Sequence, residues 1–182
     1  VRYTDETKTF LPDQFVTSDP LGLFPPGSVP GFRLVPFVES EQSITETTPM
    51  LNLAYRWTDR FMVYGTWSEG FKSGGFTQRI FPPLPAPPPF DPEFAESYEL
   101  GFKFDSENAR LRLNGAAFFT DYTDLQVQVL VGVQPLTANA GGAEVKGFEL
   151  ELQAVPVEDL EITAGIGYTD AEYTSLDPTV LA

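Results

Sequence analysis

The sequence predicts an all-β protein: an antiparallel meander of long strands that forms part of a large transmembrane β-barrel. Three observations predict this fold class. Apolar and polar residues alternate with period two over long segments, connections alternate between short and long, and aromatic residues gather near the strand ends. Alternation with period two gives each strand one apolar face and one polar face.

The clearest alternation lies in residues 96–122, which are predicted to form one long hairpin around a short polar turn at residues 105–108. In its first strand the apolar positions are Tyr98, Leu100, Phe102 and Phe104, and the positions between them are Glu99, Gly101 and Lys103. In its second strand the apolar positions are Leu111, Leu113, Gly115, Ala117 and Phe119. A helix does not fit, because a period of 3.6 would put Glu99 and Lys103 on one stripe with Phe102.

The remaining elements follow in chain order. Residues 1–10 alternate weakly and are predicted to end a strand, and residues 11–46 are predicted to be a long loop. Strands are predicted over residues 49–57 and 61–69, joined by a turn at 58–60, and a long irregular segment with a proline-rich run covers 70–93. After the hairpin, residues 123–142 form a second long connection, in which 125–131 has strand character. Strands over 143–154 and 160–168, joined by a turn at 156–159, complete the series.

Composition excludes several classes of function. The chain has 182 residues and a net charge of -15, which argues against nucleic acid as a partner. No apolar run approaches the roughly 20 residues of a membrane helix, so any membrane crossing must use strands. Cys and His are both absent, which removes disulfides, thiol chemistry and Ser-His-Asp or Cys-His arrangements. We therefore expect no enzyme, no catalytic residue, no cofactor and no metal site.

The pattern leaves open what the apolar face touches. Predicted strands of about nine to thirteen residues can cross a bilayer, and a closed barrel satisfies every backbone group without water. The polar face, which carries Lys103, Asn114, Glu149 and Glu151, suits a water-filled or plugged lumen. A soluble, secreted, glycan-binding β-sandwich would show similar alternation on any single strand. Strand length and loop asymmetry favour the barrel.

Four runs in this chain resemble the C-terminal barrel of TonB-dependent outer-membrane receptors, and the resemblance extends from about residue 49 to residue 173. They are YGTWSEGFKSGGF at 64–76, PEFAESYELGFK at 92–103, FFTDYTDLQ at 118–126 and NAGGAEVKGFELE at 139–151. The resemblance implies a barrel of about 22 strands with a plugged lumen, short periplasmic turns and long extracellular loops. It also implies that residues 1–182 are an internal, partial barrel domain, without the plug domain and the other strands. We expect this part not to fold alone, because an open set of membrane strands leaves two edges unpaired and a lipid-facing belt exposed to water.

The function that this resemblance implies is TonB-energised active transport of a scarce ligand, such as a ferric siderophore, across the outer membrane of a Gram-negative bacterium. The expected partners are outer-membrane lipid, TonB acting through a plug domain outside this chain, and the small-molecule ligand. A passive porin-like channel is the alternative; such a protein would lack the plug and the TonB motif.

Candidate ligand-contacting residues lie in the long connections, because the loops of such receptors recognise their ligands. They are Lys72, Arg79, Phe81, Phe90, Gln126 and Gln128. The Gly74-Gly75 pair is expected to allow a turn or bulge with positive φ, not to cradle a phosphate. Asp121 and Asp124 are expected to cap a strand or turn.

Overall fold

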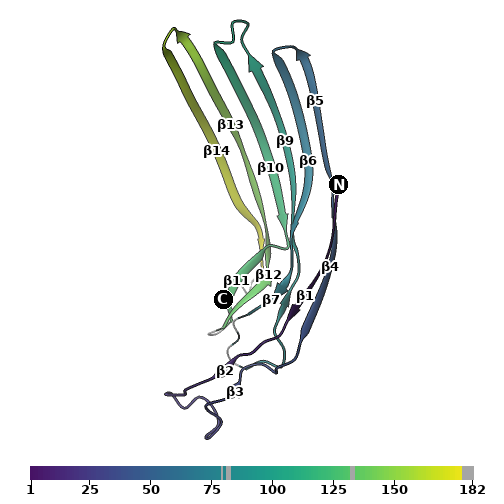
Figure 1. The fold of residues 1–182 in the computed structure, drawn as a ribbon, viewed down its shortest axis with the longest axis vertical. Helices are drawn as coiled ribbons and strands as arrows, with labels where there is room; N and C mark the ends of the chain where they lie inside the picture. The colour runs from purple at the N-terminus through teal and green to yellow at the C-terminus, as the bar shows by residue number, and fades with distance from the viewer. Residues whose placement is uncertain (79, 81–82, 132–133, 178–182) are drawn as a thin grey trace.

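A computed structural model describes residues 1–78, 80, 83–131 and 134–177, and within these ranges the chain forms strands and connections only. Six strands make one antiparallel sheet in the order β14-β13-β10-β9-β6-β5 (Figure 1). They are β5 (Met50–Thr58), β6 (Phe61–Lys72), β9 (Glu93–Asp105), β10 (Leu111–Thr123), β13 (Gly141–Val157) and β14 (Leu160–Leu176). This sheet is one wall of a barrel that does not close within the described residues. The part of the chain that the structure describes contains no helix long and apolar enough to cross a membrane.

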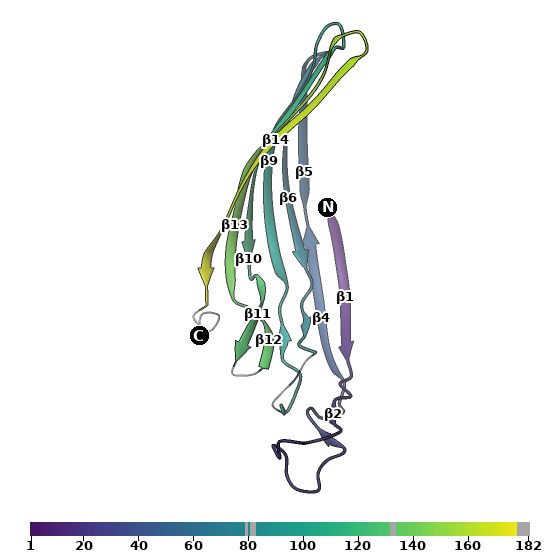
Figure 2. The same cartoon turned by 90° about the vertical axis from the view of Figure 1, so that its left-hand side faces the viewer.

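The two ends of the wall differ, as the sequence predicted. At one end short turns join β5 to β6, β9 to β10 and β13 to β14 (Figure 1). At the other end the connections are long and carry short strands of their own (Figure 2). These short strands are β2 (Phe15–Val16), β3 (Phe32–Arg33), β7 (Gly75–Phe76), β8 (Pro89–Phe90), β11 (Gln126–Val131) and β12 (Gln134–Asn139).

The strand register confirms the predicted faces. Residues paired across neighbouring strands point to the same side of a sheet. One such row crosses the whole wall, and it consists of Tyr55, Val63, Phe102, Gly115, Leu150 and Ile166. Apolar side chains on this face are open: Leu53 is 67% exposed and Leu100 is 69% exposed. No second sheet of described residues covers them, whereas the β-sandwich alternative requires such a sheet.

The apolar face ends abruptly toward the long loops. A row of five carboxylates crosses it two residues beyond Trp67 and Tyr98, at Glu69, Glu96, Asp121, Glu144 and Glu172. Carboxylates are costly in hydrocarbon, so this row marks the aqueous edge of the apolar band. The indole nitrogen of Trp67 and the hydroxyl of Tyr98 both donate to Glu96, as expected of aromatic residues at a membrane interface.

Two predicted boundaries were wrong. Part of the predicted loop over 11–46 is a strand, β4 (Ser40–Thr48), which pairs along its whole length with β1 (Arg2–Phe10). Both faces of β4 are polar, and Ile44 is its one aliphatic residue, so the sequence shows little apolar alternation there. Strands β13 and β14 are also longer than predicted, with 17 residues each. Their extra length lies mainly beyond the apolar band.

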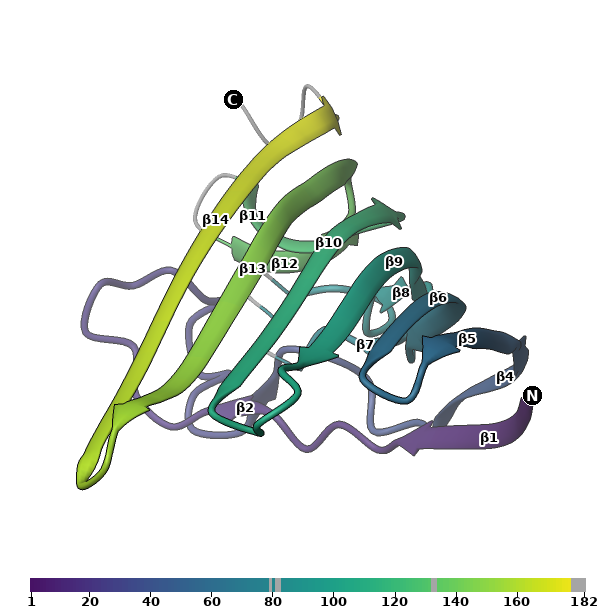
Figure 3. The same cartoon turned by 90° about the horizontal axis from the view of Figure 1, so that it is seen from above.

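The long loops fold onto the polar side of the wall. Strands β4 and β5 are continuous through Pro49, because Glu69 N–H donates to the Pro49 carbonyl at 3.0 Å just beyond the Met50–Ser68 pair. Seen from above, the wall runs from β14 to β5 and continues through β4 to β1 (Figure 3). Even-numbered residues of β4 therefore share the face of Asn52, which is the polar, lumenal face. Ile44 on this face is only 4% exposed, and the side chains of Glu6 and Gln42 beside it contact the connection between β6 and β9.

The core of the described residues lies in this loop layer, apart from Ile44 on the inner face of β4. Its buried apolar side chains are Val35, Ile44, Ile80, Val129 and Ala140. A backbone hydrogen bond from Leu84 N–H to Leu34 O at 2.9 Å joins the connection after β6 to the connection before β4, and a second, from Leu34 N–H to Gln14 O at 3.0 Å, lies within the connection before β4. The loops at this end are thus packed against one another.

Candidate functional site

The connection after β6 lies directly on the inner face of β1 and β4. Lys8 Nζ donates to the carbonyl oxygen of Gly74 at 2.7 Å, and Gln42 Nε2 donates to the carbonyl oxygen of Phe90 at 3.1 Å. One side chain from each strand of the two-stranded sheet thus holds one end of this connection. At the long-loop end of the wall, called the mouth from here on, the backbone of this connection is thus hydrogen-bonded to the inner face of β1 and β4.

Gly74 is required for close approach, which corrects the expectation of positive φ. A Cβ atom at Gly74 would collide with the carbonyl oxygen of Phe90 and would lie 3.0 Å from the carbonyl carbon of Asp91. Among the described glycines, those with positive φ are instead Gly22, Gly27 and Gly31, in the loop before β4. At Gly74 the lack of a side chain lets two stretches of backbone lie against each other.

Two charged side chains of β1, Glu6 and Lys8, form hydrogen bonds with this connection. Ser73 Oγ donates to Glu6 Oε2 at 2.6 Å, and Lys8 Nζ lies 3.5 Å from Glu6 Oε1. The Ser73 hydroxyl, and to a smaller extent the Lys8 charge, hold the pKa of the Glu6 carboxyl below its usual value. Glu6 lies beyond the apolar band, so water reaches this contact.

A hollow of about 520 Å³ opens between β1 and the two long connections. The rings of Phe10 and Phe76 stack at its edge with centroids 6.0 Å apart. Its lining mixes aromatic, cationic and amide groups, and the residues are Lys8, Thr9, Phe10, Lys72, Ser73, Gly74, Gly75, Phe76, Gln78, Phe90 and Gln126. This combination suits a ligand with flat apolar parts and polar or anionic substituents.

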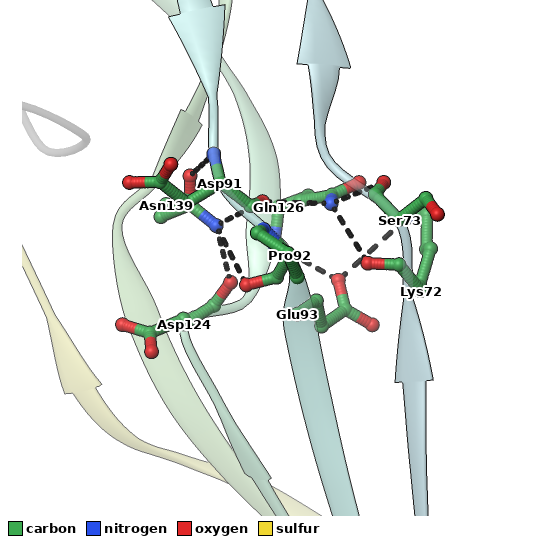
Figure 4. Close-up of polar contacts among 8 residues, drawn as sticks. All are labelled: Lys72, Ser73, Asp91, Pro92, Glu93, Asp124, Gln126 and Asn139. Carbon is green, nitrogen blue, oxygen red and sulfur yellow. Dashed lines mark hydrogen bonds and ion pairs between the residues drawn. The ribbon is translucent and has the colours of Figure 1, made fainter. Parts of the chain in front are cut away.

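Gln126 forms one wall of the hollow and joins three segments (Figure 4). Its Nε2 donates to the carbonyl oxygens of Ser73 and Asp91, each at 3.0 Å, and lies 3.4 Å from that of Lys72. Its backbone N–H donates to Glu93 Oε2 at 2.9 Å. Lys72 Nζ lies 3.6 Å from the same carboxylate oxygen, so Glu93 forms an ion pair with Lys72 and a hydrogen bond with Gln126.

Asn139 makes the second junction of this network (Figure 4). Its Oδ1 accepts from Asp91 N–H at 2.7 Å, and its Nδ2 donates to the carbonyl oxygens of Asp91 and Asp124, each at 2.8 Å. Asp124 sits in the turn between β10 and β11 with a φ of 53°, as its predicted turn position requires. Sequence reasoning noted the run that begins at Asn139 but did not select the residue as part of a site.

The structure brings three of the six candidate ligand-contacting residues together. Lys72, Phe90 and Gln126 line the hollow. Gln128 lies on β11 with its side chain exposed, away from the hollow. Arg79 and Phe81 lie outside the described residues. Besides Asn139, sequence reasoning missed Glu6 and Lys8, because a strand of mixed polar residues gives no sign of what its inner face meets.

Comparison with known proteins identifies the family. Residues 1–180 match the family described as "TonB dependent receptor-like, beta-barrel". The chain belongs to this family of TonB-dependent receptors. It is 39% identical over 85 residues to a probable TonB-dependent siderophore receptor, PiuA, of Acinetobacter baumannii, which is 46% of this chain and 11% of that protein. It is 30% identical over 139 residues to the metal-pseudopaline receptor CntO of Pseudomonas aeruginosa, which is 74% of this chain and 18% of that protein.

Solved structures show the same fold. The ferric yersiniabactin uptake receptor FyuA from Yersinia pestis superposes with a TM-score of 0.64 at 24% identity, over 75% of this chain and 20% of that chain. The chain therefore spans a fifth or less of these relatives. TonB-dependent receptors are outer-membrane proteins of Gram-negative bacteria, so the predicted fold class and location are confirmed. The family is one of transport receptors, in agreement with the expectation that this chain is not an enzyme.

Proposed function

We propose that the protein containing this chain binds a ferric siderophore at its outer face and carries it inward with energy delivered by TonB. Relatives named as receptors for siderophores and for metal-pseudopaline support the ligand class. The observation that carries the proposal is the hollow at the mouth, which lies on the lumenal side of a receptor-type wall. A ligand held there stands at the start of the path through the barrel.

The energy source follows from the location. The outer membrane has no nucleotide supply, so work must arrive mechanically, and we propose that TonB supplies it through a plug domain outside this chain. The open apolar face of the wall is proposed to contact outer-membrane lipid, because its exposed Leu, Ile and aromatic side chains suit hydrocarbon. This segment then acts as scaffold and as part of the ligand-binding surface.

We propose that Lys72, Phe90 and Gln126 take part in ligand contact from the wall of the hollow. Lys72 is 62% exposed at its side chain, so its ammonium group is open to a ligand despite its ion pair with Glu93. Gln128 is proposed as a contact from the exposed face of the β11–β12 hairpin. The same proposal extends to Arg79 and Phe81, which lie outside the described residues.

Iron uptake by cells tests the proposal. The gene is deleted and restored, and uptake of radioactive iron is measured with ferric yersiniabactin, ferric alcaligin and ferric preacinetobactin as probes. We expect uptake of at least one probe to require both this gene and a working TonB. Uptake that needs the gene but continues without TonB would support a passive porin-like channel instead. Uptake of every probe without the gene would refute the proposed function.

A further inference from the structure

Asn139 uses its side chain as though it were the backbone of a neighbouring strand. Its Oδ1 accepts from Asp91 N–H at 2.7 Å and its Nδ2 donates to Asp91 O at 2.8 Å. Both polar groups of the Asp91 backbone are thereby paired just before β9 begins. The same Nδ2 donates to Asp124 O at 2.8 Å. One carboxamide thus ties the end of β12 to the start of β9 and to the turn before β11.

Gln126 lies directly opposite Asn139, because the two residues form the first cross-strand pair of the β11–β12 hairpin. Its Nε2 donates to the same Asp91 carbonyl oxygen at 3.0 Å and to Ser73 O at 3.0 Å. The first and last residues of the hairpin, Gln126 and Asn139, therefore both bind the backbone of Asp91. These side-chain bonds add to backbone bonds at the same base, from Leu125 N–H to Gly141 O at 2.9 Å and from Ala140 N–H to Leu125 O at 3.0 Å, and they tie the hairpin to the segment before β9.

The hairpin also contacts the connection between β6 and β9, which lines the hollow. Thr137 N–H in β12 donates to Thr77 Oγ1 at 3.3 Å, and Thr77 is 5% exposed. Val129 in β11 is 6% exposed, so the hairpin contributes an apolar side chain to the loop core. Any movement at the base of the hairpin would change the spacing between Gln126 and the opposite wall of the hollow.

We propose that Asn139, together with Gln126, is a positioning residue for ligand capture, which locks the β11–β12 hairpin at its base and thereby sets the width of the hollow. This inference rests on the proposed function. The contacts require a carboxamide at position 139, because that group places an N–H donor and an oxygen acceptor side by side, as needed to meet both the C=O and the N–H of Asp91. A carboxylate of the same shape would turn its acceptors toward the carbonyl oxygens of Asp91 and Asp124.

Spin labelling of the full-length receptor in outer membranes tests the lock without any ligand. A nitroxide is attached at Leu130→Cys on the hairpin or at Val38→Cys on another loop; both positions are 63% exposed, and the chain itself has no Cys. We expect Asn139→Asp to increase the mobility of the label at Leu130 and to leave the label at Val38 unchanged. An unchanged label at Leu130 would overturn the proposal.

The matched control is Asn108→Asp, in the turn at the opposite end of the wall. The side chain of Asn108 accepts through Oδ1 from Ser106 Oγ and from Arg110 N–H, and aspartate keeps both bonds. It adds the same charge without breaking the lock, so the label at Leu130 should not change. Equal effects of the two variants would assign the change to charge alone and overturn the proposal.

Ligand affinity tests the second half of the proposal. With whichever of the three ferric chelates the wild-type receptor binds, we expect Asn139→Asp to raise Kd at least tenfold while barrel insertion and heat-modifiable migration stay unchanged. A Kd within twofold of wild type would overturn the role in capture. If Asn139→Asp does not insert, Asn139→Ala is measured in the same way. Failure of the wild-type receptor to bind any chelate would refute the proposed function, and the labels would still decide the lock.

Discussion

Gly74→Ala offers the sharpest test of how the mouth is built. A Cβ atom at this position would lie 3.0 Å from the carbonyl carbon of Asp91 and 3.0 Å from Gln42 Nε2, against a lower limit of 3.4 Å for ordinary contact. The backbone at Phe90 and Asp91 must therefore retreat by about 0.4 Å or more. Because backbone cannot rotate away as a side chain can, we expect a cost of about 1–3 kcal/mol, typical of overpacking.

Amide hydrogen exchange of the full-length receptor measures this loss of local stability in the segments that contact Gly74. A loss of about 1–3 kcal/mol in local stability speeds exchange by about 5- to 150-fold, and we expect this in the segments around residues 72–78 and 90–93. Gly70→Ala is the matched control, since a Cβ atom there meets nothing within 4 Å. It should leave exchange unchanged or slightly slower, because alanine suits a strand interior better than glycine. Equal exchange in the two variants would refute the close-approach argument.

Three further predictions concern charge and exposure. The Ser73 hydroxyl lowers the pKa of the Glu6 carboxyl. The stabilisation from the Ser73–Glu6 hydrogen bond is therefore fully present above pH 4.5, the usual pKa, and is lost as the pH falls through the lowered pKa. Ser73→Ala should raise that pKa toward 4.5 in a ¹³C-carboxyl titration assigned with Glu6→Gln, and an unchanged titration would contradict the argument. Spin labels at Leu113 and Asn114 should report oxygen-rich lipid and water, respectively, and the wall assignment fails if both report the same environment. Lys72→Gln should change stability by less than about 1 kcal/mol, since the Lys72 side chain is 62% exposed and Glu93 keeps its hydrogen bond from Gln126 N–H, while raising ligand Kd several-fold, and an unchanged Kd would remove Lys72 from the contact surface.

The wall was predictable because its information is local. Strands such as β9 and β10 alternate with period two and are joined by a short polar turn, so the sequence specifies both the faces and the pairing. The predicted apolar positions Leu100, Phe102 and Leu113 all lie on one face in the structure. The family resemblance added the barrel and the location, which alternation alone left open against a sandwich.

The loop end was predictable only in part. The strand character of residues 125–131 was recognised, and β11 begins at Gln126. The pairing of β1 with β4 was missed, because the two strands are separated by about 30 residues and contain few apolar positions. Lys72, Phe90 and Gln126 were chosen from their place in long connections, and the structure brings them around one hollow.

The sequence by itself determined the six strands of the wall, their two faces, the short turns and, through its motifs, the family. The tertiary structure decided that the long loops pack over the polar face and that Gln126 and Asn139 meet at Asp91. The physical reason is that these two carboxamides bind backbone carbonyl groups. Every residue carries such a group, so the sequence holds no sign of which carbonyl an amide side chain will reach until distant segments lie side by side.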